Sequence, residues 1–178
     1  MTLANRVKTW LDRESLRPIV APVSSQLAKF HGVGVRAIFC DQGIWMHQTS
    51  HGFFAYHQPY VRLDLAKMDA AAQAHFFWGY HPRLGDVVMD VGAGVGEETL
   101  TFSRAVGPGG RVICMEAHPR TLRCLEKLIE YNHLTNVTAV HEAATEPSCA
   151  VATIRRLPGI SGQPFEYRAR LFRGRDHH

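Results

Sequence analysis

The sequence has few cysteines, and their spacing matches neither a metal site nor a disulfide framework. Its 178 residues include four of them, and no two form a Cys-x-x-Cys pair: Cys40, Cys114, Cys124 and Cys149. Cys114 falls in an expected strand and Cys124 in an expected helix, so we expect both to be small core residues. Such cysteine usage fits a reducing compartment, and we expect the protein to be cytoplasmic.

Long apolar runs are also absent. The N-terminus shows neither an apolar signal core nor a run long enough to cross a membrane. We expect residues 1–34 to form a helical segment, with an amphipathic helix at Leu3–Arg13 and a second piece at Ser24–Phe30. Pro18 and Pro22 are expected to interrupt the chain between the two pieces. For the first helix, packing on its own domain is the favoured interpretation, and docking on a membrane surface is the alternative.

Charge of either sign is modest. The chain has a net charge of +4 and is 46% hydrophobic, enough to bury one core but hardly two. The excess of positive charge gathers near the end of the chain: Arg155, Arg156, Arg168, Arg170, Arg173 and Arg175. A nucleic-acid-binding module that uses this tail is an alternative interpretation, but the arginines are few and RNA-binding signatures are lacking, so nucleic acid is not the expected partner.

Metal-ligand spacings are missing as well. Within residues 35–66 we expect a hairpin of Val35–Cys40 and Ile44–His47, joined by a glycine-containing turn at Asp41–Gly43 and followed by a loop. Three histidines lie in this segment: His47, His51 and His57. Their intervals are irregular and no cysteine or acid completes the set, so we expect no metal site.

The most informative stretch that is present runs from Val87 to Leu100. Its first five residues form an apolar, β-branched run, which predicts a strand buried on both faces of a parallel sheet. Three alternating glycines follow, and Glu97–Val106 is expected to be a helix. A strand, a glycine-rich turn and a helix make the first half of a βαβ unit, whose turn lets a ligand lie on the backbone.

The spacing of the glycines separates two classes of cofactor. A dinucleotide fingerprint needs glycine at the first, third and sixth positions, and counting from Gly92 the sixth is Glu97. An NAD-binding oxidoreductase is therefore the less favoured interpretation. The pattern present is Asp90-x-Gly92-x-Gly94-x-Gly96, an acid at the end of a strand followed by alternating glycines.

Two further acids follow expected strands. Arg111–Met115 is a short apolar run followed by Glu116, and a carboxylate about 20 residues past the glycine turn suits the two hydroxyl donors of a ribose. Helices are expected at Lys67–Tyr80 and Arg120–Asn132. A third strand, Val137–Val140, comes shortly before Glu142.

The glycine pattern resembles motif I of the class I methyltransferases, which bind S-adenosyl-L-methionine. Longer stretches resemble the FkbM family of methyltransferases: Gly-Asp-Val-Val-Met-Asp-Val-Gly-Ala-Gly-Val-Gly at 85–96, Val-Gly-Pro-Gly-Gly-Arg-Val at 106–112, Glu-Ala-His-Pro at 116–119 and Asn-His-Leu-Thr-Asn-Val at 132–137. The resemblance covers residues 80–144 and identifies residues 67–146 as the cofactor-binding core of an α/β, Rossmann-like domain.

The resemblance implies transfer of a methyl group from S-adenosyl-L-methionine to an oxygen of a small molecule or sugar. The cofactor-binding residues that it implies, by position, are Asp90, Gly92, Ala93, Gly94, Gly96, Glu116, Ala117 and Glu142. Asp90 would lie near the amino-acid end of the cofactor, and Glu142 would accept a hydrogen bond from the adenine amine. The sequence has no Asn/Asp-Pro-Pro-Tyr stretch and no Pro-Cys nucleophile, which disfavours methylation of base amino groups and of cytosine C5 by analogy.

The sequence departs from the family in its last part. Only three parallel strands can be placed, and the later strand that ends in a Lys-Ile-Asp-x-Glu-Gly type of motif has no counterpart. Residues 147–178 are expected to hold two short strands, Ala150–Leu157 and Phe165–Phe172, and the basic tail, as in a truncated domain. We therefore expect a cofactor-binding fragment with weak catalysis and an open sheet edge that favours a homo-oligomer. No catalytic base is assigned, although His81, His118 and His141 lie near expected strand or helix ends.

Overall fold

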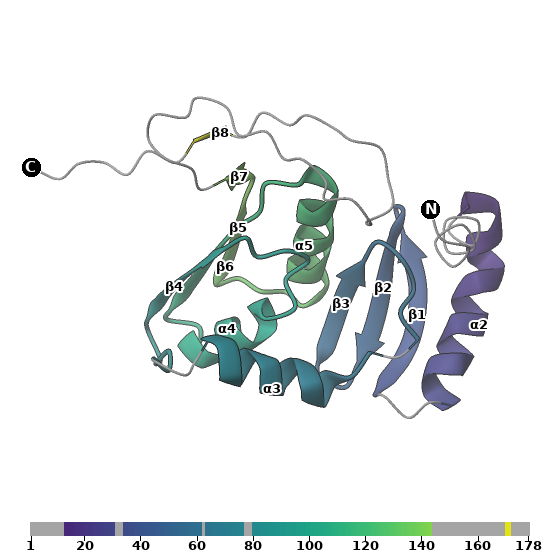
Figure 1. Ribbon diagram of the computed structural model, residues 1–178, viewed down its shortest axis with the longest axis horizontal. Helices are drawn as coiled ribbons and strands as arrows, with labels where there is room; N and C mark the ends of the chain where they lie inside the picture. Colours follow the sequence, from purple (N-terminus) through teal and green to yellow (C-terminus); the bar gives the residue numbers. More distant parts are fainter. Residues whose placement is uncertain (1–12, 31–33, 62, 77–79, 144–169, 172–178) are drawn as a thin grey trace, which may run out of the picture.

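The computed structural model describes residues 13–30, 34–61, 63–76, 80–143 and 170–171. Two sheets organise the chain: an antiparallel meander near the N-terminus and a parallel sheet that follows it, with one helix between them (Figure 1). The parallel sheet and its helices confirm the α/β, Rossmann-like fold class. No helix in the described ranges has the length and apolarity needed to cross a membrane.

The first long helix, α2 (Arg17–Phe30), includes both prolines that were expected to interrupt it, so this prediction is wrong. Pro18 lies in the first turn, where its missing N–H has no helical partner to lose. Pro22 lies inside the helix, which tolerates it because the inner face of α2 packs on the meander. The Ser25 hydroxyl joins the two elements, since it donates to the Ile38 carbonyl at 2.9 Å and accepts from the Ile38 amide at 2.7 Å. The helix expected at Leu3–Arg13 lies outside the described residues, apart from its last position.

The predicted hairpin is the first part of a three-stranded meander. Strands β1 (Val35–Asp41) and β2 (Ile44–Thr49) pair as expected, and β3 (Gly52–Tyr56) adds a third antiparallel strand that was not predicted. Strand β2 does not alternate between polar and apolar residues because four of its residues in succession are buried. α2 covers one side of the meander and helix α5 (Pro119–Tyr131) lies against the other (Figure 1).

The parallel sheet has the order β4-β5-β6, with β4 (Val87–Val91), β5 (Arg111–Met115) and β6 (Val137–Val140) as predicted. Helix α4 (Thr99–Val106) and α5 pack on one face, and they share a core that includes Phe102, Leu125 and Val112. α4 begins two residues later than expected because Glu97 and Glu98 belong to the turn. Helix α3 (Leu65–Phe76) precedes the sheet and begins two residues before the expected start of that helix.

The prediction that β4 is buried on both faces is wrong. Val87, Met89 and Val91 are 65%, 50% and 55% exposed, whereas Val88 packs against the core of α4 and α5. In the described part of the chain β4 pairs with β5 alone, so it is the outer strand of the sheet. Its apolar sequence is that of an inner strand, but its surroundings in this structure are those of an edge.

An asparagine joins the meander to the helix between the sheets. Asn132, just after α5, accepts from the Phe53 amide at 2.8 Å and donates from Nδ2 to the carbonyls of Phe53 and Leu128, both at 2.7 Å. Its side-chain amide thus meets the outer edge of β3 as a neighbouring strand would. On the same helix Lys127 pairs with Asp41 of β1 at 2.7 Å, and Tyr131 donates to the same carboxylate.

The described part of the chain after β6 is short. Strand β7 (Glu142–Ala143) pairs in parallel with β8 (Arg170–Leu171). The strand expected at Ala150–Leu157, and most of the one at Phe165–Phe172, lie outside the described residues, as do most of the tail arginines.

Candidate functional site

The glycine-rich turn connects the carboxyl end of β4 to α4 and is anchored on the neighbouring strand. The amides of Gly92 and Ala93 both donate to the Met115 carbonyl, at 2.9 and 3.0 Å. This contact holds the turn at the edge where β4 and β5 end. In open parallel sheets, ligands bind outside the carboxyl ends of the strands.

The three glycines of the turn have different surroundings. A Cβ at Gly92 would meet nothing within 4 Å, and at Gly94 it would approach only the Gly92 carbonyl, at 4.0 Å. A Cβ at Gly96 would come within 2.7 Å of Leu125, so this glycine lets α5 pack against the turn. Gly92 and Gly94 therefore leave open space over the backbone, which is where a ligand can approach.

Glu116 lies directly beside the turn, although 22 residues separate it from Gly94 in sequence. Its Oε2 accepts from the Gly94 amide at 3.0 Å, and its Oε1 accepts from the His118 amide at 2.7 Å. These two bonds orient the carboxylate at the end of β5. Each oxygen keeps a further lone pair that can accept from a ligand hydroxyl.

Asp90 completes an acidic group at this edge. Burial, together with the nearby carboxylates of Glu98 and Glu116, raises the pKa of Asp90 to about 6. No described Lys or Arg forms an ion pair with Asp90. An acid such as Asp90, without a described ion-pair partner and beside other carboxylates, favours a ligand that brings positive charge.

The third strand end brings two more of the predicted residues together. The His141 side chain donates from Nε2 to the Ala117 carbonyl at 3.2 Å, which joins the segments after β6 and β5. Next to it, the Oε2 atom of Glu142 is buried and has no hydrogen-bond partner in the described part of the chain. A buried acceptor without a donor costs free energy unless a ligand supplies one.

The meander also reaches this edge, which the sequence did not predict. Tyr56, the last residue of β3, is 5% exposed, and its hydroxyl forms no hydrogen bond of normal geometry with described residues. Burial raises the pKa of Tyr56, and the carboxylates of Glu97 and Glu98 raise it further. The missed signal was the aromatic run Phe53–Tyr56 after a glycine, which marks a strand that ends near the glycine turn.

The three histidines considered for metal binding have other surroundings. His47 is fully buried, and its Nε2 accepts from the Tyr60 amide at 2.9 Å. His57 contacts Cys124 and Thr121 on α5, at 3.3 and 3.4 Å. The described residues hold no group of three or more His, Cys, Asp or Glu placed to bind a metal ion.

Nucleophilic cysteine chemistry is disfavoured at the two buried thiols. Burial raises the pKa of Cys114 to about 11 and that of Cys124 to about 12, so both remain protonated near neutral pH. His118 is occupied as the N-cap of α5, where its Nδ1 accepts from the amides of Arg120 and Thr121.

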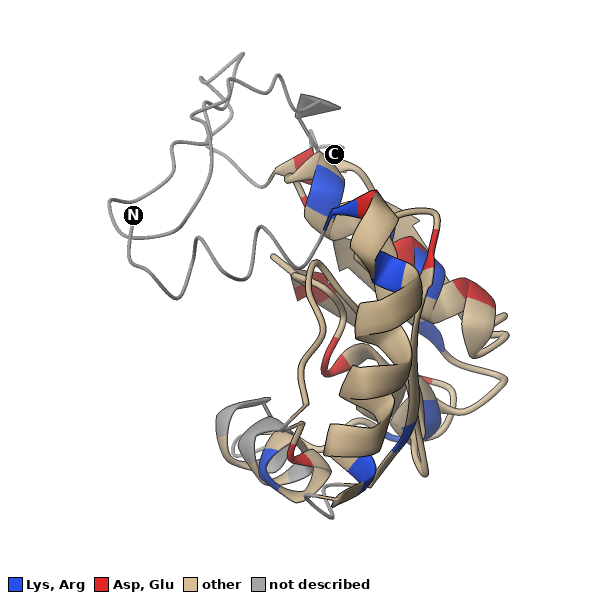
Figure 2. Ribbon diagram, turned by 90° about the vertical axis from the view of Figure 1, so that its right-hand side faces the viewer, with Lys and Arg blue, Asp and Glu red and all other residues tan. Residues whose placement is uncertain are grey.

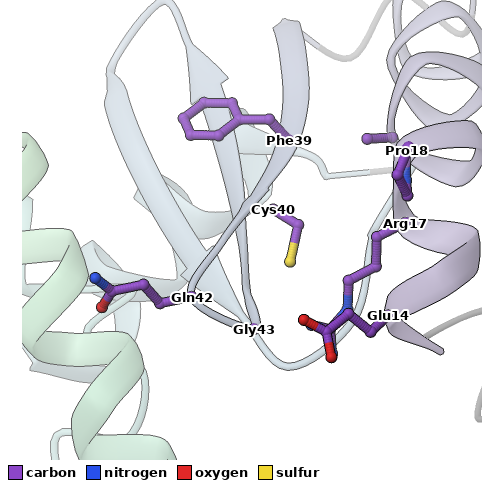
Figure 3. Close-up of a pocket in the computed structure, with 8 residues that line it drawn as sticks. Glu14, Arg17, Pro18, Phe39, Cys40, Gln42 and Gly43 are labelled. Atoms are coloured by element: carbon purple, nitrogen blue, oxygen red, sulfur yellow. The ribbon is translucent and has the colours of Figure 1, made fainter.

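A separate cavity of about 660 Å³ lies between α2 and the turn of β1 and β2 (Figure 3). It contains none of the predicted site residues; its lining is Glu14, Arg17, Pro18, Ala21, Phe39, Cys40, Gln42 and Gly43. The cavity therefore lies outside the group of acids and glycines described above.

Comparison with known proteins gives local matches. No protein-family model matches the chain, so the resemblance to the FkbM family stays a prediction. Among curated proteins, tRNA (adenine(58)-N(1))-methyltransferase catalytic subunit TRM61 from two strains of Cryptococcus neoformans var. neoformans serotype D is 39% identical over 59 residues. The match covers 33% of this chain and 14% of each relative, so the chain spans only a small part of their length.

Solved structures with a similar arrangement include fibrillarin from Aeropyrum pernix, in complex with S-adenosyl-L-methionine. It is 17% identical with a TM-score of 0.38, and the match covers 62% of this chain and 58% of that one. TYW2 from M. jannaschii, in complex with AdoMet, is 20% identical with a TM-score of 0.41 over 65% of this chain and 49% of that one.

Proposed function

We propose that this chain holds the S-adenosylmethionine-binding part of a class I methyltransferase. The observation that carries the proposal is the glycine turn, with open space over Gly92 and Gly94 and the Glu116 carboxylate bonded to the Gly94 amide. A cofactor that lies over this backbone would have its ribose hydroxyls within the reach of Glu116.

The other predicted residues fit the same ligand. Asp90 has no described ion-pair partner and lies near the carboxylates of Glu98 and Glu116, which suits the positively charged amino-acid end of the cofactor. The Oε2 atom of Glu142 is a buried acceptor without a donor, and the adenine amine is a donor. When bound, the cofactor supplies an electrophilic methyl group on its sulfonium. The chain's own residues bind and orient it and exclude water.

Calorimetric titration with S-adenosylmethionine, S-adenosylhomocysteine and NADH tests the proposal. We expect both sulfur ligands to bind more tightly than NADH, because Glu97 stands where a dinucleotide site needs glycine. Tighter binding of NADH, or no binding of the sulfur ligands, would contradict the proposed cofactor.

For the acceptor we propose a hydroxyl of a small molecule or sugar, following the resemblance to the FkbM family. A second candidate is an adenine of tRNA, which the 59-residue match to a tRNA methyltransferase subunit favours. Transfer of radiolabel from S-adenosylmethionine to unmodified tRNA or to a panel of sugars distinguishes them. We expect weak transfer to either, because the described sheet has only the three strands that form the cofactor side.

A further inference from the structure

The meander contributes a buried polar group to the edge where the glycine turn lies. Tyr56 is held by aromatic neighbours: its ring meets the His47 ring edge-on at 5.0 Å between centroids and the Tyr60 ring at 4.8 Å. These contacts fix the direction of a side chain whose hydroxyl makes no hydrogen bond of normal geometry with described residues. A hydroxyl that is buried in this way costs free energy, so its position calls for an explanation.

The carboxylate of Glu97, which follows the third glycine of the turn, lies near enough to the Tyr56 hydroxyl to raise its pKa. Glu97 is half-buried, and its carboxylate forms no ion pair with a described residue. Through Glu98 the acidic group continues to Asp90 and from there to Glu116 on the Gly94 amide. These carboxylates therefore gather around the turn, where Glu116 is bonded to the Gly94 amide.

We infer that Glu97 binds the cationic methionine end of S-adenosylmethionine and that Tyr56 is the positioning residue of Glu97. The inference rests on the proposed function. S-adenosylmethionine has two positive groups at this end, the sulfonium and the α-ammonium. Its product S-adenosylhomocysteine keeps only the ammonium, and methylthioadenosine has neither. A carboxylate at this place therefore distinguishes the three ligands by charge.

Tyr56 acts through Glu97 and does not touch the ligand. Its hydroxyl can donate to one carboxylate oxygen of Glu97, which leaves the other oxygen for the ligand. Because its pKa is raised, the phenol stays neutral and remains a donor over the whole physiological pH range. Binding of a cation beside Glu97 would draw the carboxylate and the hydroxyl into a regular hydrogen bond.

The test is calorimetry of the full chain with the three ligands and the variant Glu97→Gln. We expect the variant to lose about tenfold in affinity for S-adenosylmethionine, less for S-adenosylhomocysteine and nothing for methylthioadenosine. Glu126→Gln, which removes the same charge from an exposed position on α5, is the matched control and should leave all three affinities unchanged.

Tyr56→Phe removes only the hydroxyl. We expect a smaller loss with the same order of ligands, and no additional loss when Tyr56→Phe is combined with Glu97→Gln. Because the hydroxyl forms no hydrogen bond of normal geometry with the described residues, its removal should not lower the melting temperature. A purely structural role would instead lower the melting temperature and affect all ligands equally.

The outcomes separate the two proposals. If the unmodified chain binds none of the ligands, the proposed function fails. If it binds them but Glu97→Gln weakens all three equally or none, the proposed function stands and the inference about Glu97 is overturned. Loss that persists in Tyr56→Phe on the Glu97→Gln background would overturn the positioning role of Tyr56.

Discussion

Two buried ionisable residues, Asp90 and His47, lie on different sheets and respond to pH in opposite directions. Burial and neighbouring carboxylates raise the pKa of Asp90 from 3.8 to about 6, so folding favours its neutral form. Burial lowers the pKa of His47 from 6.5 to about 4, so folding again favours the neutral form. Both residues titrate between pH 4 and 6.5, where their effects on stability oppose each other.

The two opposite contributions to the pH dependence of stability can be measured separately by substituting Asp90 or His47 alone. In Asp90→Asn only His47 remains, and the free energy of unfolding should rise as the pH increases from about 4 to 6.5, because the unfolded state then holds more protons. In His47→Gln, which keeps an acceptor for the Tyr60 amide, the free energy of unfolding should fall from about pH 4 to 6. Urea unfolding at a series of pH values measures both slopes. Equal slopes in the two variants would show that these residues do not carry the pH dependence.

Glu116 provides a second prediction at this scale. Glu116→Gln keeps the shape of the side chain but replaces one acceptor oxygen by a donor, so it loses one of the two bonds to the amides of Gly94 and His118 as well as acceptance from a ribose hydroxyl. We expect a loss of about 1.5–3 kcal/mol in affinity for S-adenosylhomocysteine, typical of a hydrogen bond to a charged group. Calorimetry measures the loss and circular dichroism checks the fold. Unchanged affinity in a folded variant would mean that Glu116 serves only to hold the turn through Gly94 and His118.

At the scale of elements, the role of the glycine turn in binding can be distinguished from the backbone strain that a substitution in it would cause. Gly94 and Gly85 both have positive φ angles, +60° and +90°, with open space for a Cβ. Alanine at either position should cost about 1–2 kcal/mol of stability from the left-handed backbone. Only Gly94→Ala should also weaken S-adenosylmethionine binding, by about tenfold or more, because Gly85 lies at the opposite end of β4. Equal binding by the two variants would contradict the proposed path of the cofactor.

The hydrogen bonds of Asn132 are expected to stabilise the packing of the meander against α5. Asn132→Ala removes two bonds to the Phe53 backbone and one to the Leu128 carbonyl, and leaves an edge of β3 without its partner. We expect the free energy of unfolding to fall by about 2–4 kcal/mol in chemical denaturation. Glu126→Ala, on the exposed face of α5, should change it by less than about 0.5 kcal/mol. A similar small change in Asn132→Ala would mean that water replaces the asparagine.

Sequence reasoning was most successful where local pattern and tertiary context agree. Strands β4, β5 and β6 were predicted from their apolar runs and the βαβ pattern, whose geometry brings the ends of parallel strands to one edge. The bond between Glu116 and the Gly94 amide was not predicted. Strand β3 was missed because its residues do not alternate between buried and exposed, so the aromatic run Phe53–Tyr56 was its one local signal. Tyr56 ends β3 of the meander and Glu97 lies in the glycine turn, and no local pattern encodes the proximity of two such distant segments.

At the scale of the whole molecule, the described residues include two exposed apolar surfaces. One is the outer face of β4, and the other is a stripe along α2 formed by Ile19, Val23, Leu27 and Phe30. Figure 2 looks onto α2 and shows a helix that is mostly uncharged, since Arg17 and Lys29 are its only charged residues. Apolar stripes and strand edges of this kind favour association.

The β4 surface gives a testable prediction of self-association. Met89→Lys places a charge at the centre of the exposed face without removing a core contact, since Met89 is half exposed. We expect the variant to be more soluble and to sediment as a smaller species than the unmodified chain in analytical ultracentrifugation. Leu27→Lys on α2 distinguishes the two surfaces: if it alone reduces the sedimenting mass, the helix and not the strand edge is the contact.

The bond between Asn132 and Phe53 also has a consequence for synthesis of the chain. The residues that it joins are 79 positions apart, so β3 leaves the ribosome long before the asparagine that completes its edge. At about 5–20 residues per second, this delay is roughly 4–16 s. During that interval the nascent meander presents an unpaired, aromatic strand to its surroundings. We expect chaperones that hold nascent chains to engage residues 52–56, and to release them once α5 has emerged.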